Sequence, residues 1–370
     1  MRRVGKSTAV KHLLTHLKHS NFIYLDCERV EIRVLFSGDN YEGIKDDLTT
    51  LGIDFNRPAL IALDEIQLVE NLPSVIKYFY DTYDVKFIVT GSSSYYMKNQ
   101  FSESLAGRKR IFEMYPLSFK EFLDFKDAEV LNYEKYNWQL INKTWYNKYA
   151  SYYAEYIKFG GFPEVVLEPD YDDKIEIIRD IINSYIELDV KLLSDYSISE
   201  DLYKLVRVLA ARSGNKIDFS KISSVTGINR QKISAYVSLL ESTYFIYQVT
   251  PFTRNIDKEI SQQTKLYFAD TGILSLLGGE QLSSGQIFEN AIAVQLKIQG
   301  TLQYYQKKNG QEIDFIYNGA IALEVKETPV QQDKQTLEQR AKGIDLDKYH
   351  ILGRNLPMSG FLDFIWGGNI

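Results

Sequence analysis

The residues Gly5-Lys6-Ser7-Thr8 have the form of the second half of a phosphate-binding loop, G-x-x-x-x-G-K-[ST], at the start of an amphipathic stretch. In such a loop the glycine lets backbone N–H groups close around phosphate oxygens, the lysine reaches the β- and γ-phosphates, and the hydroxyl coordinates Mg²⁺. The first glycine of the motif would stand immediately before Met1. The tetrapeptide therefore predicts phosphate binding through half of the loop.

Two further segments continue this pattern in sequence order. The apolar run Leu60–Leu63 ends in Asp64 and Glu65, of which the first would hold the Mg²⁺ shell and the second would orient or activate the attacking water. In Val89–Ser93 a β-type run ends in hydroxyls, among them that of Thr90, which are suited to sensing the γ-phosphate or positioning water. Each piece alone also fits a helix start, a strand with surface acids or a Ser/Gly turn. Their order and spacing together favour binding of ATP and Mg²⁺.

A third group of chemically active residues lies near the C-terminus. Asp314 lies in Glu312–Ile316, and Glu324 and Lys326 follow in the next apolar run. Side chains two positions apart on a strand share a face, so Glu324 and Lys326 point the same way. Two acids and a lysine that converge can bind Mg²⁺, with the lysine stabilising or helping to generate a hydroxide. The alternative is an amphipathic edge strand with a Glu/Lys surface pair.

The elements that would position the N-terminal group alternate over residues 1–125 in the pattern of a parallel sheet covered by helices. The expected strands are Phe22–Cys27, Leu60–Leu63, Lys86–Thr90 and Arg110–Met114. The expected helices are Ser7–Leu17, Tyr41–Leu51 and Leu72–Tyr83. This alternation predicts an α/β domain.

Residues 126–200 have helical periodicity, which is broken at Phe159–Pro163 because Gly-Gly and Pro end a helix. In 201–255, three helical stretches precede a β-rich run, which predicts a winged helix-turn-helix; the four segments are Asp201–Ala211, Phe219–Val225, Arg230–Leu240 and Tyr244–Thr250. Arg230 and Lys232 give its recognition helix only a modest phosphate footprint. A protein-packing role for this segment is an equal alternative to DNA binding.

A last α/β segment begins near Leu266 and runs to the C-terminus. Its expected strands are Gln303–Gln306, Glu312–Tyr317 and Ala320–Val325. The second and third of these strands carry Asp314 and Glu324, and Lys326 comes directly after the third.

Composition limits the class of protein. The chain has 370 residues, of which 45% are hydrophobic and 25% charged, and this excludes wholesale disorder. With 43 Lys and Arg against 49 Asp and Glu the net charge is −6, so a nucleic-acid contact would need a local basic patch. The single cysteine, Cys27, cannot form an internal disulfide. No apolar run approaches the roughly 20 residues of a membrane span, so we expect a cytoplasmic protein without a membrane partner.

Further motifs extend over nearly the whole chain: Ser104–Arg108, Tyr115–Phe119, Gly160–Glu164, Lys265–Phe268, Asp270–Gly272 and Phe288–Asn290. With the N-terminal group, they resemble an AAA-type P-loop ATPase family of bacteria and archaea that carries a C-terminal domain of unknown function. The resemblance implies ATP binding and hydrolysis, and it makes Arg108 a candidate γ-phosphate or coupling arginine. A surface arginine after a glycine turn is the alternative. Such sites often borrow an arginine from a neighbouring chain, which leaves an oligomer open.

The C-terminal acids and lysine resemble the PD-(D/E)XK nuclease fold. This implies a restriction-endonuclease-like α/β domain in which Glu289, on the preceding helix, is a further metal-binding acid. Asp314 and Glu324 are then the expected Mg²⁺ ligands, and Lys326 completes the candidate catalytic group with DNA as substrate. Related domains also keep this fold as a binding or structural module, so cleavage stays open.

The expected organisation is an AAA-type domain at 1–125, a helical region at 126–200, a winged helix at 201–255 and a nuclease-like domain at 256–370. Members of the resembled family have a further strand leading into the first glycine of the loop, so we expect the true start to lie upstream. The expected function is an ATPase coupled to a DNA-binding or nuclease-like domain. The alternative is a nucleotide-switched binding or scaffold protein whose nuclease fold is inactive.

Overall fold

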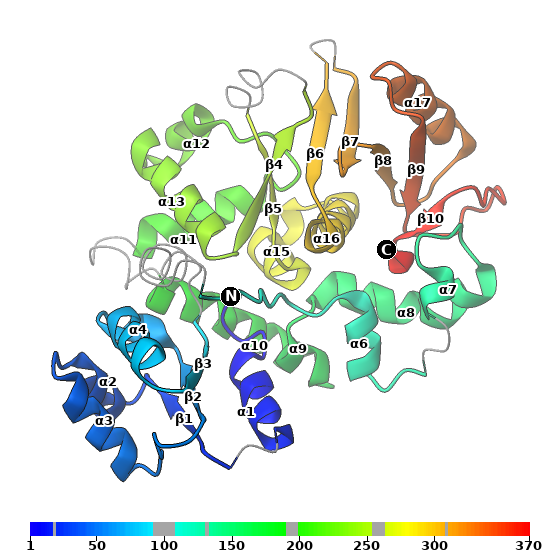
Figure 1. Ribbon diagram of the computed structural model, residues 1–370. Coiled ribbons are helices and arrows are strands. Elements are labelled where there is room, and N and C mark those ends of the chain that lie inside the picture. Colours follow the sequence, from blue (N-terminus) through cyan, green and yellow to red (C-terminus); the bar gives the residue numbers. More distant parts are fainter. Residues whose placement is uncertain (18–19, 92–107, 130–132, 190–198, 254–262, 308–309) are drawn as a thin grey trace. The chain divides into compact units, whose positions relative to one another are not determined.

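The computed structural model describes residues 1–17, 20–91, 108–129, 133–189, 199–253, 263–307 and 310–370. The chain divides into two compact units, Met1–Met114 and Tyr115–Ile370. Each unit has its own β-sheet (Figure 1). The N-terminal candidate residues therefore lie in one unit, and the C-terminal candidates lie in the other.

The N-terminal unit has a parallel sheet in the order β1-β2-β3, made of β1 (Phe22–Asp26), β2 (Ala59–Asp64) and β3 (Val85–Val89). The middle strand β2 is buried at every position, which accounts for its continuous apolar run. The three strands agree with the sequence-based expectations to within one residue at each end. Asp26 and Asp64 are register partners at the carboxyl ends of β1 and β2.

Helices cover both faces of this sheet. They are α1 (Lys6–His16), α2 (Val30–Ser37), α3 (Tyr41–Thr50) and α4 (Leu72–Thr82), with a 3₁₀ turn η1 (Ile66–Leu68) after β2. Leu14 of α1 packs with Leu60 and Ala62 on one face. Ile61 and Leu63 pack with residues of α2, α3 and α4 on the other face. Alternate residues of β2 thus serve two separate cores, as in a three-layer α/β domain.

One sequence-based expectation for this unit was wrong, and one helix was not expected. The segment Arg110–Met114 forms no strand, and in the part of the chain that the structure describes no strand pairs with it. Its apolar side chains are instead exposed, Phe112 by 79%. A β-type composition leads to a strand only where a neighbour completes the hydrogen bonds. Helix α2 was missed because it is short and lacks a side-chain cap.

The Tyr115–Ile370 unit contains a seven-stranded mixed sheet in the order β10-β9-β8-β7-β6-β4-β5. Its strands are β4 (Ile246–Pro251), β5 (Lys265–Phe268), β6 (Leu302–Gln306), β7 (Glu312–Tyr317), β8 (Ile321–Lys326), β9 (Lys348–Gly353) and β10 (Ile365–Trp366). Strand β4 pairs antiparallel with β5 and parallel with β6. The β-rich run after the three expected helices therefore belongs to the same sheet as the C-terminal strands.

The helices of this unit are mostly short. They are α6 (Phe119–Phe125), α7 (Tyr133–Tyr136), α8 (Lys143–Phe159), α9 (Pro163–Leu167), α10 (Tyr171–Ser184), η2 (Tyr185–Asp189), α11 (Ser199–Ala210), α12 (Phe219–Thr226), α13 (Arg230–Ser242), α15 (Thr271–Gly278), η4 (Gly279–Gln281), α16 (Ser284–Gln299), α17 (Gln331–Lys342) and η5 (Gly367–Asn369). Helix α8 ends at Gly160, so the expected break at Gly-Gly-Phe-Pro is confirmed.

Aromatic side chains join the helical region to the C-terminal end of the chain. Tyr149 and Tyr153 of α8 are buried, and the ring of Tyr153 lies 5.1 Å from that of Trp366. The Tyr133 hydroxyl donates to the carbonyl of Gly368 at 3.0 Å. Residues before 160 and after 360 therefore share one core, and the helical region is an integral part of the larger unit.

The corner after α8 is held by the buried carboxylate of Asp270. Its oxygens accept backbone N–H groups from Gly161 at 2.8 Å, Gly272 at 2.8 Å and Ile273 at 3.1 Å. Gly160 has a φ of +79°, and a Cβ there would come within 2.1 Å of the carboxylate, so only glycine fits. Burial raises the pKa of Asp270 to about 6 although the three N–H groups favour the ionised form.

We expect Asp270→Ala to lower the free energy of unfolding by about 3 kcal/mol, because it removes a helix cap and leaves the buried Gly161 N–H without a partner. Asp218→Ala is the matched control, because Asp218 caps α12 through two equivalent bonds at a partly exposed position. Its expected loss is about 1 kcal/mol. Denaturant unfolding at pH 8, where Asp270 is ionised, measures both, and equal losses would contradict the role of the Gly161 bond.

Candidate functional site

The start of α1 has the features of an anion site. Gly5 precedes the helix at a φ of +91°, a conformation that favours glycine. The first N–H groups of a helix have no carbonyl partner within it, and this first turn has neither a side-chain cap nor an acidic residue. The Lys6 ammonium donates to the carbonyl of Met1 at 2.6 Å and so lies across the loop. Ser7 is partly buried and Thr8 is exposed in the same turn.

Asp64, at the carboxyl end of β2, collects hydroxyl groups from three other elements. The Tyr24 hydroxyl of β1 donates to its Oδ2, and the Thr90 hydroxyl just after β3 donates to its Oδ1. The Ser7 hydroxyl of α1 is a third hydrogen-bond partner. The structure thus brings Ser7, Asp64 and Thr90 together, as the order of the motifs suggested. Tyr24 was missed, because its contact depends on the pairing of β1 with β2.

These hydrogen bonds set the charge of the group. Burial disfavours an ionised Asp64, but the hydroxyls of Ser7, Thr90 and Tyr24 outweigh it and hold the pKa of Asp64 below its usual value. Burial and the neighbouring Asp64 raise the pKa of Tyr24, which therefore stays a neutral donor. An anionic carboxylate beside a serine hydroxyl is a pair of hard oxygen donors, which fits Mg²⁺.

Glu65 follows directly at the turn between β2 and η1. Its backbone has a φ of +50°, in the left-handed region that a non-glycine residue rarely adopts. Its half-buried carboxylate accepts a hydrogen bond from the Gln67 amide. Ser92 and Ser93 of the third motif lie outside the described residues, so Thr90 is the hydroxyl of that motif that the structure places.

Arg108 is not brought to this group. Its guanidinium pairs with Asp81 at 3.0 Å and lies 5.9 Å from the ring centroid of Tyr80, both in the last turn of α4. Helix α4 runs back from the carboxyl end of β2 to the start of β3, so its last turn lies at the opposite edge of the sheet from Asp64. A role for Arg108 in catalysis therefore stays a prediction.

The C-terminal candidates converge on one region of the mixed sheet. Glu289 lies on α16, Asp314 on β7, and Glu324 and Lys326 on β8. Asp314 accepts the Val325 N–H at 2.8 Å, and Lys326 pairs with Glu324 at 2.9 Å. The charge of Asp314 acts on both Glu289 and Glu324. The structure therefore assembles the four residues expected from the sequence.

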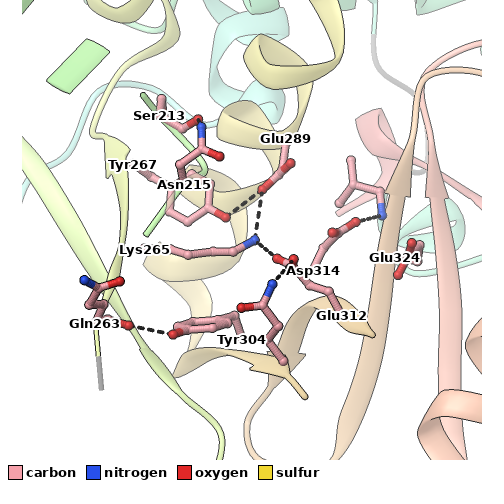
Figure 2. Close-up of polar contacts among 12 residues, drawn as sticks. Ser213, Asn215, Gln263, Lys265, Tyr267, Glu289, Tyr304, Glu312, Asp314 and Glu324 are labelled. Atoms are coloured by element: carbon pink, nitrogen blue, oxygen red, sulfur yellow. Dashed lines mark hydrogen bonds and ion pairs between the residues drawn. The ribbon is translucent and has the colours of Figure 1, made fainter. Parts of the chain in front are cut away.

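Four further residues in this cluster were not predicted as site residues, and Figure 2 labels Lys265, Tyr267 and Glu312 among them. Lys265 of β5 pairs with Glu312 and lies 3.9 Å from Glu289, and Tyr267 donates to Glu289 at 2.7 Å. Arg340 of α17 lies 3.5 Å from Glu324. Lys265 and Tyr267 belong to the quoted motif Lys265–Phe268, but the sequence does not reveal what these side chains face. We call Lys265, Tyr267, Glu289, Glu312, Asp314, Glu324, Lys326 and Arg340 the acidic cluster.

Burial dominates the electrostatics of the acidic cluster. It raises the pKa of Glu289 and Glu324, and the charge of Asp314 raises both further. Burial also raises the pKa of Asp314, while Lys265 opposes the shift. Carboxyl groups with raised pKa values in close proximity share protons near neutral pH, and a bound cation would favour their ionised forms.

The cluster provides some of the ligands that Mg²⁺ needs. Among the described residues, no group of three or more His, Cys, Asp or Glu side chains is arranged to hold a metal ion. However, the Oε2 atom of Glu324 is buried and accepts no hydrogen bond from any described group. A buried carboxylate oxygen without a partner costs free energy, which a cation beside Asp314 and Glu324 would recover.

The helix expected to read DNA carries little unpaired positive charge. Lys232 of α13 pairs with Asp201 of α11 at 2.6 Å. On α11 itself, Lys204 pairs with Glu200 at 2.9 Å. Arg230 at the start of α13 is exposed. These ion pairs reduce the phosphate footprint that the sequence suggested.

Among the described residues, none of the helices has the length and apolar character needed to span a bilayer.

Two family models match separate parts of the chain. Residues 1–123 match the family model of an AAA domain, and residues 150–283 match that of a domain of unknown function (DUF8612). An uncharacterized protein of Methanocaldococcus jannaschii, MJ1544, is 27% identical over 95% of this chain and 79% of its own length. An uncharacterized protein of Haemophilus influenzae is 24% identical over 90% of this chain and 83% of its own.

A solved structure, the Walker-type ATPase PABY2304 of Pyrococcus abyssi, is similar to 75% of this chain and 89% of its own, with 14% identity and a TM-score of 0.45. The AAA-domain match agrees with the parallel sheet, the helix start at Lys6 and the acidic end of β2. The N-terminal unit is therefore an AAA-type, P-loop ATPase-like domain.

Proposed function

We propose that the N-terminal unit binds ATP with Mg²⁺ and hydrolyses it. The observation that carries this proposal is the convergence of Ser7, Thr90 and Tyr24 on Asp64, beside the uncapped start of α1. Gly5, Lys6 and Thr8 provide the remaining contacts of the half loop. The site is the kind of preorganised polar environment in which phosphate charge is stabilised.

In this proposal each residue has a separate task. The helix start and the Lys6 ammonium bind the phosphate oxygens, which requires Lys6 to leave the Met1 carbonyl. Ser7 and Asp64 would hold Mg²⁺, which neutralises charge on the phosphates. Glu65 orients the attacking water, and Thr90 holds Asp64 in place.

We expect excess ATP with Mg²⁺ to stabilise the chain against thermal unfolding, by about 2.7 kcal/mol at a hundredfold excess over the Kd. Lys6→Ala should abolish this stabilisation, because it removes the cation that faces the phosphates. Lys77→Ala is the control, since Lys77 is an exposed lysine on α4 of the same unit. An equal thermal shift in Lys6→Ala would show that ATP binds elsewhere.

Glu65→Gln should lower the rate of ATP hydrolysis by about 10²-fold or more while leaving ATP binding intact, because glutamine cannot accept a proton from water. Phosphate release and ATP affinity are measured on the same preparation. Glu70→Gln is the control, because Glu70 is an exposed acid five positions further on. Loss of binding together with hydrolysis would assign Glu65 to structure.

For the larger unit we propose a nuclease-like domain that acts on DNA with Mg²⁺. The proposal is supported by the meeting of Asp314, Glu324 and Lys326 on neighbouring strands, and by the unpartnered Oε2 of Glu324. Asp314 and Glu324 would hold Mg²⁺, and Lys326 would stabilise the hydroxide that attacks a phosphodiester. Helices α11, α12 and α13 with β4 would be the winged helix.

The second candidate function is a nucleotide-switched binding or scaffold protein with an inactive nuclease fold. The ion pairs of Lys232 and Lys204 favour it, because they engage two of the four cations on α11 and α13. In both candidate functions, the bound nucleotide can shift the population of conformations only if it makes different contacts in each conformation.

Asp314→Asn should abolish Mg²⁺-dependent nicking of supercoiled DNA if the acidic cluster is a nuclease site. The expected reason is loss of a carboxylate ligand, whereas Asp347→Asn removes an exposed acid and should change nothing. Agarose gels report nicking, and circular dichroism reports folding of both variants. Nicking that persists in Asp314→Asn, or that is absent from the unaltered chain, would favour the scaffold.

A further inference from the structure

Lys265 is a buried cation inside the acidic cluster. It lies on β5 and is only 5% exposed. Its ammonium pairs with Glu312, lies 3.9 Å from Glu289 and lies 5.6 Å from the ring centroid of Tyr304 (Figure 2). Lysine is rarely buried to this degree unless it is paired. The three surrounding acids, Glu289, Asp314 and Glu312, raise the pKa of Lys265 against the effect of burial, so the ammonium stays charged.

The surrounding structure fixes the position of Lys265. Asn290, next to Glu289 on α16, accepts the Phe268 N–H at 2.8 Å and donates to the Phe268 carbonyl at 2.9 Å. This double hydrogen bond, fully buried, locks α16 against β5, the strand that carries Lys265. Lys265 and Glu289 are therefore held opposite each other by the attachment of α16 to β5, in addition to their own contact at 3.9 Å.

The oxygen atoms of the acidic cluster divide into two groups. On one side, Glu289 has Tyr267 and Lys265 as partners, and Glu312 has Lys265 and Gln306. On the other side, Oε1 of Glu324 faces both Lys326 and Arg340, while Oε2 has no hydrogen-bond partner among the described residues. The two acids beside Lys265 have their partners, whereas Glu324 keeps one open acceptor.

We propose that Lys265 occupies the place of a second divalent cation, so that the acidic cluster takes a metal ion only at Asp314 and Glu324. Glu289 is then a partner of Lys265 and Tyr267, and it is no metal ligand. This inference rests on the proposed Mg²⁺ site of the larger unit. It explains why, in the described residues, three acids are nowhere arranged around a common metal position although four lie close together.

The test is to measure Mn²⁺ binding to the full chain without nucleotide, using calorimetry and electron paramagnetic resonance. We expect Asp314→Asn to remove the Mn²⁺ site of the larger unit and Glu289→Gln to leave it unchanged. Lys265→Met should bind an additional Mn²⁺, or bind Mn²⁺ about tenfold more tightly, because it vacates a position among carboxylates.

Lys216→Met is the matched control for Lys265→Met. Lys216 is paired with Lys265 across a β-bridge, and its ammonium lies 5.4 Å from the ring centroid of the same Tyr304. The Lys216→Met variant should bind Mn²⁺ as the unaltered chain does. Lys265→Met leaves acids without their cation, so circular dichroism must show that it folds. The double variant Lys265→Met with Glu289→Gln restores the charge balance and should return to the Mn²⁺ stoichiometry of the unaltered chain.

Two results would overturn the inference while the proposed metal site stands: loss of the Mn²⁺ site in Glu289→Gln, or unchanged Mn²⁺ binding in a folded Lys265→Met. Mn²⁺ binding that appears only in Lys265→Met would show that the unaltered cluster takes no metal ion at Asp314 and Glu324, and it would overturn the inference. Mn²⁺ binding that is insensitive to Asp314→Asn would overturn the proposed site instead. Absence of Mn²⁺ binding in every variant would overturn both.

Discussion

A carboxylate that is removed from water must receive hydrogen bonds or a cation, and this requirement shapes the chain at three places. Asp64 receives hydroxyls from Tyr24, Thr90 and Ser7. Asp270 receives backbone N–H groups from both sides of a sharp corner. Asp314 receives a backbone N–H of the neighbouring strand and the field of Lys265. In each place the buried charge joins elements that are distant in sequence.

The three solutions differ in what they allow. Hydroxyl groups can rotate, so the donors around Asp64 can turn toward a metal-bound water or a phosphate. Backbone N–H groups cannot turn, so the donors around Asp270 make a rigid corner whose value is structural. The ammonium of Lys265 carries a full positive charge, so it neutralises the acids beside it as a bound cation would. The hydrogen-bond donors and cations around each buried carboxylate thus distinguish the two candidate sites, at Asp64 and Asp314, from the structural corner at Asp270.

The sequence predicted most strands and helices because their apolar patterns are local. Strand β2 and helix α13 are examples, since the buried run Leu60–Leu63 and the helical stretch Arg230–Leu240 need no distant partner to be recognised. The candidate acids Asp64, Asp314 and Glu324 were also found, because they stand at fixed places on such strands. Tyr24 and Lys265 could not be found in this way. Their roles depend on strand register and on helix-to-strand packing, which link residues far apart in the chain.

The continuity of the seven-stranded sheet has a mechanical consequence. Strand β4 follows α13 directly and is hydrogen-bonded to both β5 and β6. Backbone hydrogen bonds therefore form a continuous path from the strand that follows α13 to the strand that carries Lys265. A partner that pulls on α13 would act on the acidic cluster through this path.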